Sequence, residues 1–197
     1  MTEKTIVHSE LNFLGYYLPS NPLVIAIAGI FIAFTCGMTL LFPLLFPQGY
    51  INIGDLAVMI TALLFGPIIG AIAGGIGPMI ADFILYPLTA FLTLVIKMLE
   101  GFLVGIIANP RKNHKKIDYR TILGLIIGGL TMVFGYFFGE LIIFQNPGWA
   151  FEELPFNFFI QFGIGIIGSI IFIISFRKSI IEGLPQVFDK IFILEDL

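Results

Sequence analysis

Residues 53–82 read IGDLAVMITALLFGPIIGAIAGGIGPMIAD, and this stretch decides the fold. It is almost wholly apolar, but the dipeptide Gly66-Pro67 divides it near its middle. Because Pro cannot continue a helix and Gly favours a turn, the division predicts two short membrane helices rather than one long helix. The number of membrane crossings, and with it the side on which the amino terminus lies, depends on this turn.

The rest of the chain has the composition of a membrane protein. Of its 197 residues, 58% are hydrophobic and 12% are charged, and the mean hydropathy is +1.02. A soluble domain carries about 25% charged residues, so the charges here are too few to cover a soluble globule. The 22 glycines suit helices that approach one another closely in lipid. We therefore expect an all-α integral membrane protein.

Six apolar segments are candidates for membrane helices, since a span needs about 20 apolar residues. They are 23–45, 55–66 (which is short), 69–85, 89–108, 121–144 and 155–176. The first lacks a convincing cleavage site, so we interpret it as a retained helix and not as a signal peptide. We expect an amino-terminal segment at 1–22, a six-helix membrane domain at 23–176 and an amphipathic tail at 177–197. The tail fits either a helix at the membrane interface or a segment packed on the end of the bundle.

Basic residues indicate the orientation. Seven of the ten Lys and Arg residues follow even-numbered spans, at 111–120 and 177–178. The positive-inside rule places these flanks, and with them both termini, in the cytoplasm. The segments 46–54, 86–88 and 145–155 then face outward.

Ionisable side chains inside the spans mark candidate sites, because a charge in the bilayer is costly unless it has a partner or a function. They are Asp82, Lys97, Glu100 and Glu140. Lys97 and Glu100 are three residues apart and can pair along one helix face. Asp55 begins the second span, and we expect it to be an exposed helix cap. A buried ion-pair network that only fixes the packing is the alternative to a binding site.

Two amides lie at a similar depth. Asn157 and Gln161 are four residues apart and share one helix face, although amides between helices can also serve only as packing contacts. Aromatic side chains at this depth could stack on a ring: Tyr86, Phe91, Tyr136, Phe137, Trp149 and Phe156. We expect an outward-facing pocket for a small polar heterocycle, lined by Asn157, Gln161, Glu140, Lys97, Asp82 and Tyr136.

The first span carries a small residue at every fourth position, Gly29, Ala33 and Gly37. Such a stripe lets another helix approach closely. The sequence alone leaves open whether that helix belongs to a partner or to the same bundle.

Several other functions are disfavoured. The net charge of -3 gives no support for nucleic-acid binding, and the single cysteine, Cys36, with two distant histidines, His8 and His114, forms no metal-ligand spacing. The glycine run 70–77 lacks the Gly-Lys-Ser/Thr of a phosphate loop. We therefore expect no metal, no cofactor and no enzymatic activity.

A set of motifs together resembles the substrate-binding S components of energy-coupling factor (ECF) transporters. The resemblance covers the chain from about 23 to 176 and is closest to the branch with riboflavin-, hydroxymethylpyrimidine- and pyridoxine-type members. The motifs are Ile53-Gly54-Asp55, Ala62 to Pro67, Gly70-Ala71, Gly74 to Gly77, Ala81-Asp82, Ile96-Lys97, Glu100-Gly101, Gly105, Gly135-Tyr136-Phe137, Glu140, Pro155-Phe156-Asn157 and Gln161.

This resemblance implies a six-helix S component in a prokaryotic plasma membrane, with a vitamin-like ligand bound near the outer face under the loop 46–54. It also implies a membrane coupling (T) subunit and two cytoplasmic ATPase subunits as partners, with the coupling subunit docking at Gly29, Ala33 and Gly37. Family members are thought to topple in the membrane to release the ligand inside. The ligand does not carry over; we expect a pyrimidine- or pyridoxine-type heterocycle, with riboflavin as the alternative.

Two other functions stay open at this point. A stand-alone secondary transporter or channel would need inverted repeats or a continuous polar pathway, and the sequence shows neither. An intramembrane enzyme would use Asp82, Glu100 or Glu140 as acid-base groups, but it lacks a nucleophile and a metal set.

Overall fold

The computed structural model describes residues 12–18, 22–41, 43–46, 49–112 and 117–191. Within them, five helices are long and apolar enough to cross a membrane: Pro22–Leu41, Pro67–Leu85, Pro87–Ala108, Tyr119–Ile143 and Pro147–Gly183. A shorter apolar helix covers Gly54–Phe65. The expected all-α membrane bundle is confirmed, and five long helices with one short helix are compatible with six crossings.

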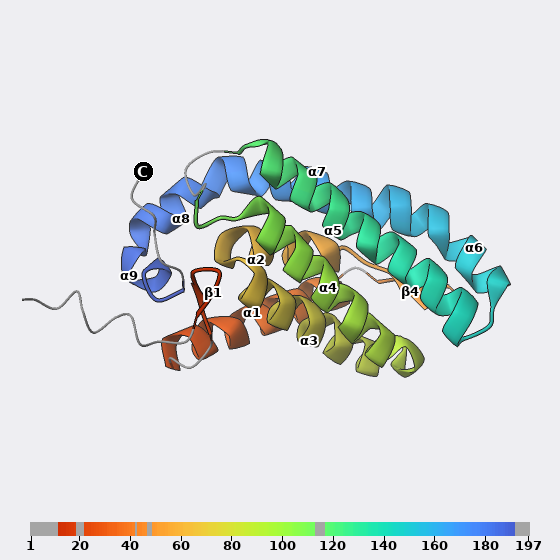
Figure 1. The fold of residues 1–197 in the computed structure, drawn as a ribbon. Coiled ribbons are helices and arrows are strands. Elements are labelled where there is room, and N and C mark those ends of the chain that lie inside the picture. Colours follow the sequence, from red (N-terminus) through yellow and green to blue (C-terminus); the bar gives the residue numbers. More distant parts are fainter. Residues whose placement is uncertain (1–11, 19–21, 42, 47–48, 113–116, 192–197) are drawn as a thin grey trace, which may run out of the picture.

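The helices run back and forth along one axis (Figure 1). The last long helix is a continuous rod of 37 residues. At 1.5 Å per residue it is about 55 Å long, far more than the bilayer core of about 30 Å, so its ends extend past the apolar layer.

The elements are β1 (Asn12–Phe13), β2 (Tyr16–Tyr17), α1 (Pro22–Leu41), β3 (Leu44–Phe46), β4 (Gly49–Ile51), α2 (Gly54–Phe65), α3 (Pro67–Leu85), η3 (Pro87–Thr89), α4 (Ala90–Ala108), α5 (Tyr119–Phe138), η4 (Gly139–Ile143), α6 (Pro147–Phe156), η5 (Asn157–Phe162), α7 (Gly163–Phe172), η6 (Ile173–Arg177), α8 (Lys178–Gly183) and α9 (Pro185–Phe188).

The predicted break at Gly66-Pro67 is present. The α2 helix ends at Phe65, Gly66 has a φ of 83°, and Pro67 is the first residue of α3. A positive φ favours glycine, and the fixed φ of proline suits the first position of a helix. Two adjacent residues therefore turn the chain without a loop.

Two predicted boundaries are wrong. The first span was expected to reach residue 45, but α1 ends at Leu41, because Pro43 disfavours helix in the residue before it, and the chain then forms the antiparallel β3–β4 hairpin. The sixth span was expected to start at residue 155, but the rod starts at Pro147. Asn146 caps it, since its Oδ1 accepts a hydrogen bond from the Trp149 backbone N–H at 3.1 Å.

Glycines bring α3 and α4 into close contact at the centre of the bundle. A Cβ added at Gly70 would lie 2.8 Å from the carbonyl oxygen of Gly101. The two helices therefore approach with backbone against backbone, which only glycine permits. The short α2 lies beside them and is buried along its length, except for the half-buried Leu56.

The described parts of both terminal segments pack on one end of the bundle (Figure 1). The Tyr16 hydroxyl donates to Asn109 Oδ1 at 3.1 Å, and burial raises the pKa of Tyr16 to about 12. The Phe188 ring stacks on Phe65 with 5.6 Å between centroids. As far as Ile191, the tail follows the second of its two interpretations, a segment packed on the end of the bundle. Residues 1–11 and 192–197 lie outside the described part of the chain.

Candidate functional site

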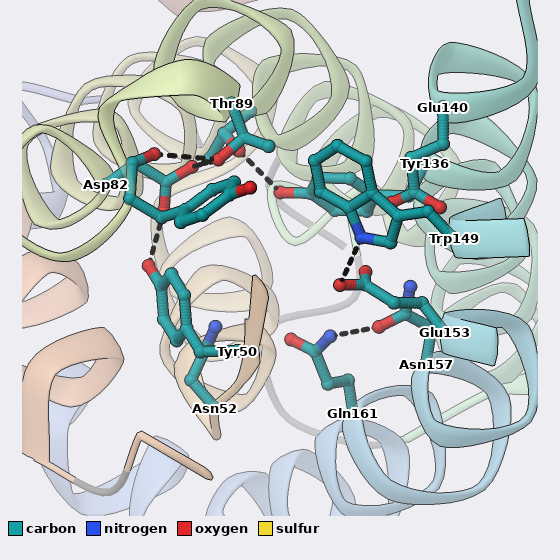
Figure 2. Close-up of a pocket in the computed structure, with 12 residues that line it drawn as sticks. Tyr50, Asn52, Asp82, Thr89, Tyr136, Glu140, Trp149, Glu153, Asn157 and Gln161 are labelled. Carbon is teal, nitrogen blue, oxygen red and sulfur yellow. Dashed lines mark hydrogen bonds between the residues drawn. The ribbon is translucent and has the colours of Figure 1, made fainter. Parts of the chain in front are cut away.

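Polar and aromatic side chains surround a cavity at the other end of the bundle, where β4 meets α3, α4, α5 and α6 (Figure 2). Its volume is about 30 Å³, room for two or three waters at about 10–15 Å³ each. The lining residues are Tyr50, Asn52, Asp82, Tyr86, Thr89, Thr93, Tyr136, Glu140, Trp149, Glu153, Asn157 and Gln161.

Hydroxyl groups hold the Asp82 carboxylate on one wall. Thr89 Oγ1 donates to Asp82 Oδ2 at 2.8 Å, Thr93 Oγ1 donates to the same oxygen at 2.5 Å, and the Tyr50 hydroxyl donates to Oδ1. Burial and the neighbouring Asp82 charge raise the pKa of Tyr50, so its phenol remains a donor. The Tyr136 hydroxyl extends the chain by donating to Thr93 Oγ1 at 2.9 Å.

The opposite wall is one face of the long rod. Trp149, Glu153, Asn157 and Gln161 follow one another at every fourth residue and all face the cavity (Figure 2). Trp149 Nε1 donates to Glu153 Oε1 at 2.8 Å, and Gln161 Nε2 donates to Asn157 Oδ1. Among the described residues, Gln161 Oε1 has no partner, so one acceptor on this wall is free for a ligand.

Glu140 projects into the cavity from the π-helical turn η4 that ends α5 (Figure 2). Its side chain is buried, and neither carboxyl oxygen has a hydrogen-bond donor in the part of the chain that the structure describes. A buried polar group without a partner is unusual in a folded protein and calls for an explanation in terms of function.

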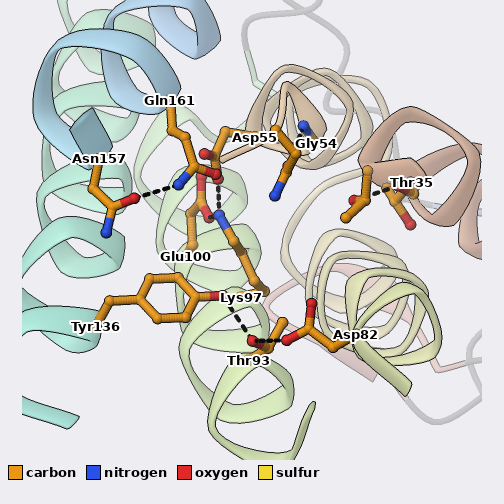
Figure 3. Close-up of polar contacts among 12 residues, drawn as sticks. Thr35, Gly54, Asp55, Asp82, Thr93, Lys97, Glu100, Tyr136, Asn157 and Gln161 are labelled. Carbon is orange, nitrogen blue, oxygen red and sulfur yellow. Dashed lines mark hydrogen bonds and ion pairs between the residues drawn. The ribbon is translucent and has the colours of Figure 1, made fainter. Parts of the chain in front are cut away.

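An ion-pair cluster lies behind the cavity wall (Figure 3). The Lys97 ammonium pairs with Asp55 and lies 3.2 Å from Glu100 Oε2. The predicted Lys97–Glu100 pair is thus present, but the prediction that Asp55 is an exposed cap is wrong: its side chain is 0% exposed. It is buried because α2 is covered by neighbouring helices even at its first turn.

The structure brings five of the six expected site residues together around the cavity: Asn157, Gln161, Glu140, Asp82 and Tyr136. The sixth, Lys97, is not among the lining residues and instead has its Nζ 5.7 Å from the centroid of the Tyr136 ring. Of the aromatic candidates, Tyr86 and Trp149 also line the cavity, whereas Phe91, Phe137 and Phe156 do not.

Sequence reasoning missed five lining residues. Glu153 was assigned to an outer loop, although its place four residues after Trp149 and four before Asn157 puts it on their helix face. Thr89 and Thr93 precede Lys97 at intervals of four residues, so their positions in the sequence likewise placed them on the helix face of Lys97. Tyr50 and Asn52 lie on and just after a hairpin strand, where no periodicity marked them.

The small-residue stripe of α1 faces away from the bundle. Gly29 and Ala33 are exposed and Gly37 is half-buried. A Cβ added at Gly29 or at Gly37 would meet no atom within 4 Å. Among the described residues, then, no helix of this bundle packs into the stripe at these two positions.

Comparisons with known proteins agree with this architecture. A sequence model described as "ECF-type riboflavin transporter, S component" matches residues 21–178. An uncharacterised Pyrococcus woesei protein is 42% identical over 125 residues, which are 64% of this chain and 80% of that protein.

A solved structure described as the S component of a bacterial ECF transporter is similar in fold, with a TM-score of 0.53 and 20% identity. The match covers 79% of this chain and 94% of that one. Because the family model spans most of the sequence and the fold agrees, this chain belongs to the ECF-type riboflavin transporter S component family, a family of substrate-binding membrane transport subunits without enzymatic activity.

Proposed function

We propose that this chain captures a small water-soluble vitamin or vitamin precursor at the outer face of a prokaryotic plasma membrane. The observation that carries the proposal is the cavity itself. Twelve residues line it, all with polar or ionisable side chains, although most of them lie on helices that are otherwise apolar enough to span a bilayer. Such groups are costly in a membrane, and the cost is offset when they bind a polar substrate.

The position of the cavity supports an outward-facing site. The elements β4 and α6, which contribute to its lining, lie at the end of the bundle away from the adjoining ends of α4 and α5 (Figure 1). The basic residues of 111–120 connect those two helix ends in the sequence. The positive-inside rule assigns that basic end to the cytoplasm. Both termini then lie in the cytoplasm, and the β3–β4 hairpin lies at the outer surface.

The lining favours a flat heterocycle. Asn157 and Gln161 can both donate and accept hydrogen bonds, and Tyr86 and Trp149 offer aromatic surfaces. This combination suits a pyrimidine- or pyridoxine-type ring, with riboflavin as the second choice. At about 30 Å³ the cavity does not yet hold such a ring, so entry of the ligand would displace the hairpin residue Tyr50 and exchange the Asn157–Gln161 bond for bonds to the ligand.

Transport would require partners. The sequence has no ATPase motif, so uphill import would depend on a membrane coupling subunit and two cytoplasmic ATPases. The exposed stripe of Gly29, Ala33 and Gly37 is suited to docking on the coupling subunit, because small residues let two helices approach closely. A stand-alone transporter, in contrast, would import the substrate without these partners.

The single tryptophan of the chain provides a direct test. Trp149 lies in the cavity wall and is 3% exposed, so a bound heterocycle should change its fluorescence. Purified protein in detergent would be titrated with thiamine, pyridoxine, hydroxymethylpyrimidine and riboflavin. Saturable quenching at one ligand per chain supports capture, and a lack of response to all four, confirmed by equilibrium dialysis, contradicts it.

A further inference from the structure

Buried carboxyl groups outnumber buried cations in the cavity half of the bundle. Five carboxyl side chains there are each at most 6% exposed, and one ammonium group, that of Lys97, is buried with them. The other buried cation among the described residues, Arg177, lies at the opposite end, where its Nη2 donates to the Pro110 carbonyl at 3.4 Å. The five carboxyls belong to Asp55, Asp82, Glu100, Glu140 and Glu153.

Three of these carboxyl groups have either a cation or several hydrogen-bond donors beside them. Asp55 and Glu100 share the Lys97 ammonium. Asp82 accepts three hydrogen bonds from hydroxyl groups, and donors of this kind stabilise the ionised form of a carboxylate. The two carboxyl groups that have neither a cation nor hydroxyl donors beside them are therefore Glu140 and Glu153.

Glu140 and Glu153 both line the cavity, and each carboxyl is close enough to influence the other through a hydrogen bond. Two carboxyl groups can form such a bond only when they share a proton. Glu153 also accepts the Trp149 indole N–H at 2.8 Å. Glu140, which is 1% exposed, has no donor among the described residues for either oxygen. Apart from the proton shared with Glu153, Glu140 thus has no hydrogen-bond donor and no cation beside it among the described residues.

Aromatic side chains form much of the remaining surface. Tyr86 and Trp149 meet edge to face with 5.7 Å between ring centroids, and Tyr50 and Tyr136 face the same cavity. Aromatic faces attract cations, most strongly where water is excluded. The Lys97 ammonium, 5.7 Å from the Tyr136 centroid, already makes one such contact from behind the wall. Aromatic walls around a carboxylate suit an organic cation better than a hydrated metal ion.

We propose that the ligand of this cavity is an organic cation, a flat heterocycle with a protonated or quaternary nitrogen, and that Glu140 is its counter-ion. This inference rests on the proposed function and adds the charge of the substrate. When a permanently charged ligand binds, the positive nitrogen replaces the proton that Glu140 and Glu153 share, and that proton leaves to solvent. The same lining repels phosphorylated and carboxylated compounds.

Proton release makes the binding dependent on pH. Affinity for a permanently charged ligand rises with pH, because less work is needed to remove the shared proton. The ionisable groups that face the pair from the surrounding elements are Tyr50, Asp82, Tyr86 and Tyr136, with Glu152 next to it on the rod and the Lys97 cluster behind the wall.

Titration calorimetry on the full chain in detergent tests the inference with probes that differ in charge. Thiamine is a permanent cation, pyridoxamine is a protonated amine, pyridoxine and riboflavin are neutral, and riboflavin 5′-phosphate is an anion. We expect a cation to bind most tightly. For that probe, Glu140→Gln should weaken binding by about tenfold or more, while Glu152→Gln, the same change at an exposed neighbour, should leave it unchanged. If thiamine is the probe that binds most tightly, its binding enthalpy should be measured in two buffers of different ionisation enthalpy. The difference between the two values should correspond to the release of about one proton.

The outcomes separate this inference from the proposed function. If a neutral or anionic probe binds most tightly, or if Glu140→Gln keeps wild-type affinity, the charge assignment is wrong while vitamin capture stands. If no probe binds, both are wrong. Glu140→Gln keeps the shape of the side chain and removes a buried charge, so we expect it to fold; gel filtration and thermal unfolding check this, and Glu153→Gln provides a second variant of the same pair.

Discussion

Lys97 on α4 and Asp55 at the start of α2 form an ion pair that is almost completely removed from solvent (Figure 3). Glu100 completes the cluster from one turn further along α4, with its Oε2 3.2 Å from Lys97 Nζ. One ammonium therefore pairs with two carboxyl groups. The cluster joins the short central helix to α4 directly behind the cavity, and we interpret it as a support for the cavity wall.

Replacing Lys97 should destabilise the protein more than replacing Asp55. Lys97→Met leaves two buried carboxyls without their ammonium, and breaking a buried pair in this way costs about 3–5 kcal/mol. Asp55→Asn leaves the Lys97–Glu100 pair in place and should cost less. Thermal unfolding in detergent measures both. Equal melting temperatures for Lys97→Met and wild type would show that the cluster does not hold α2 and α4 together.

Removing an amide from the rod should weaken ligand binding without unfolding the protein. A hydrogen bond to a neutral group contributes about 0.5–1.5 kcal/mol, and 1.4 kcal/mol corresponds to about tenfold in affinity. We therefore expect Asn157→Ala and Gln161→Ala each to lose up to about tenfold. Gln186→Ala, an exposed amide on α9 at the other end of the bundle, is the control. Wild-type affinity in both cavity variants would mean that these amides serve only in packing.

The sequence predicted those parts of the fold that depend on residue type and local spacing. Gly66-Pro67 specified the turn between α2 and α3, because glycine accepts the positive φ of the turn and proline cannot continue the preceding helix. Asn157 and Gln161 were assigned to one face from their spacing alone. Both inferences need only a few neighbouring residues, and both agree with the structure.

The specific partners of two buried carboxyl groups were not identified from the sequence. Asp55 and Glu153 each lie near an end of a predicted span, where a charge ordinarily faces water. Each is buried because of a specific partner: Asp55 has Lys97, 42 residues away, and Glu153 has the Trp149 indole on its own helix. Hydropathy records the type of a residue and not its partner, so it assigned both to the surface.

Adding bulk to the exposed stripe of α1 should abolish uptake and leave ligand binding intact. Ala33→Leu fits the isolated chain, because Ala33 is exposed, but it would hold a docking helix away. Ala33→Ser keeps the residue small and should transport normally. Uptake would be measured in cells that also produce the coupling subunit and ATPases. Normal uptake by Ala33→Leu would exclude the stripe as the docking face, and loss of binding would assign it to internal packing.

The orientation can be tested with single cysteines in a Cys36→Ser background. Lys112→Cys lies in the basic loop and Gly148→Cys lies at the start of the long rod, and both positions are exposed. With the basic loop in the cytoplasm, a membrane-impermeant thiol reagent applied to whole cells should label Gly148→Cys and not Lys112→Cys. The reverse pattern would invert the topology and place the cavity on the cytoplasmic side.

The central claim is that this chain alone captures a small molecule in the cavity between β4 and the rod. Native mass spectrometry of the purified chain, without coupling subunits or ATPases, tests it most directly. We predict one small heterocyclic molecule per chain, either co-purified or taken up from the vitamin panel, which is released on unfolding and is reduced in Glu140→Gln and Asn157→Ala. A chain that carries no molecule, and that takes up none of the panel while folded, would contradict the account.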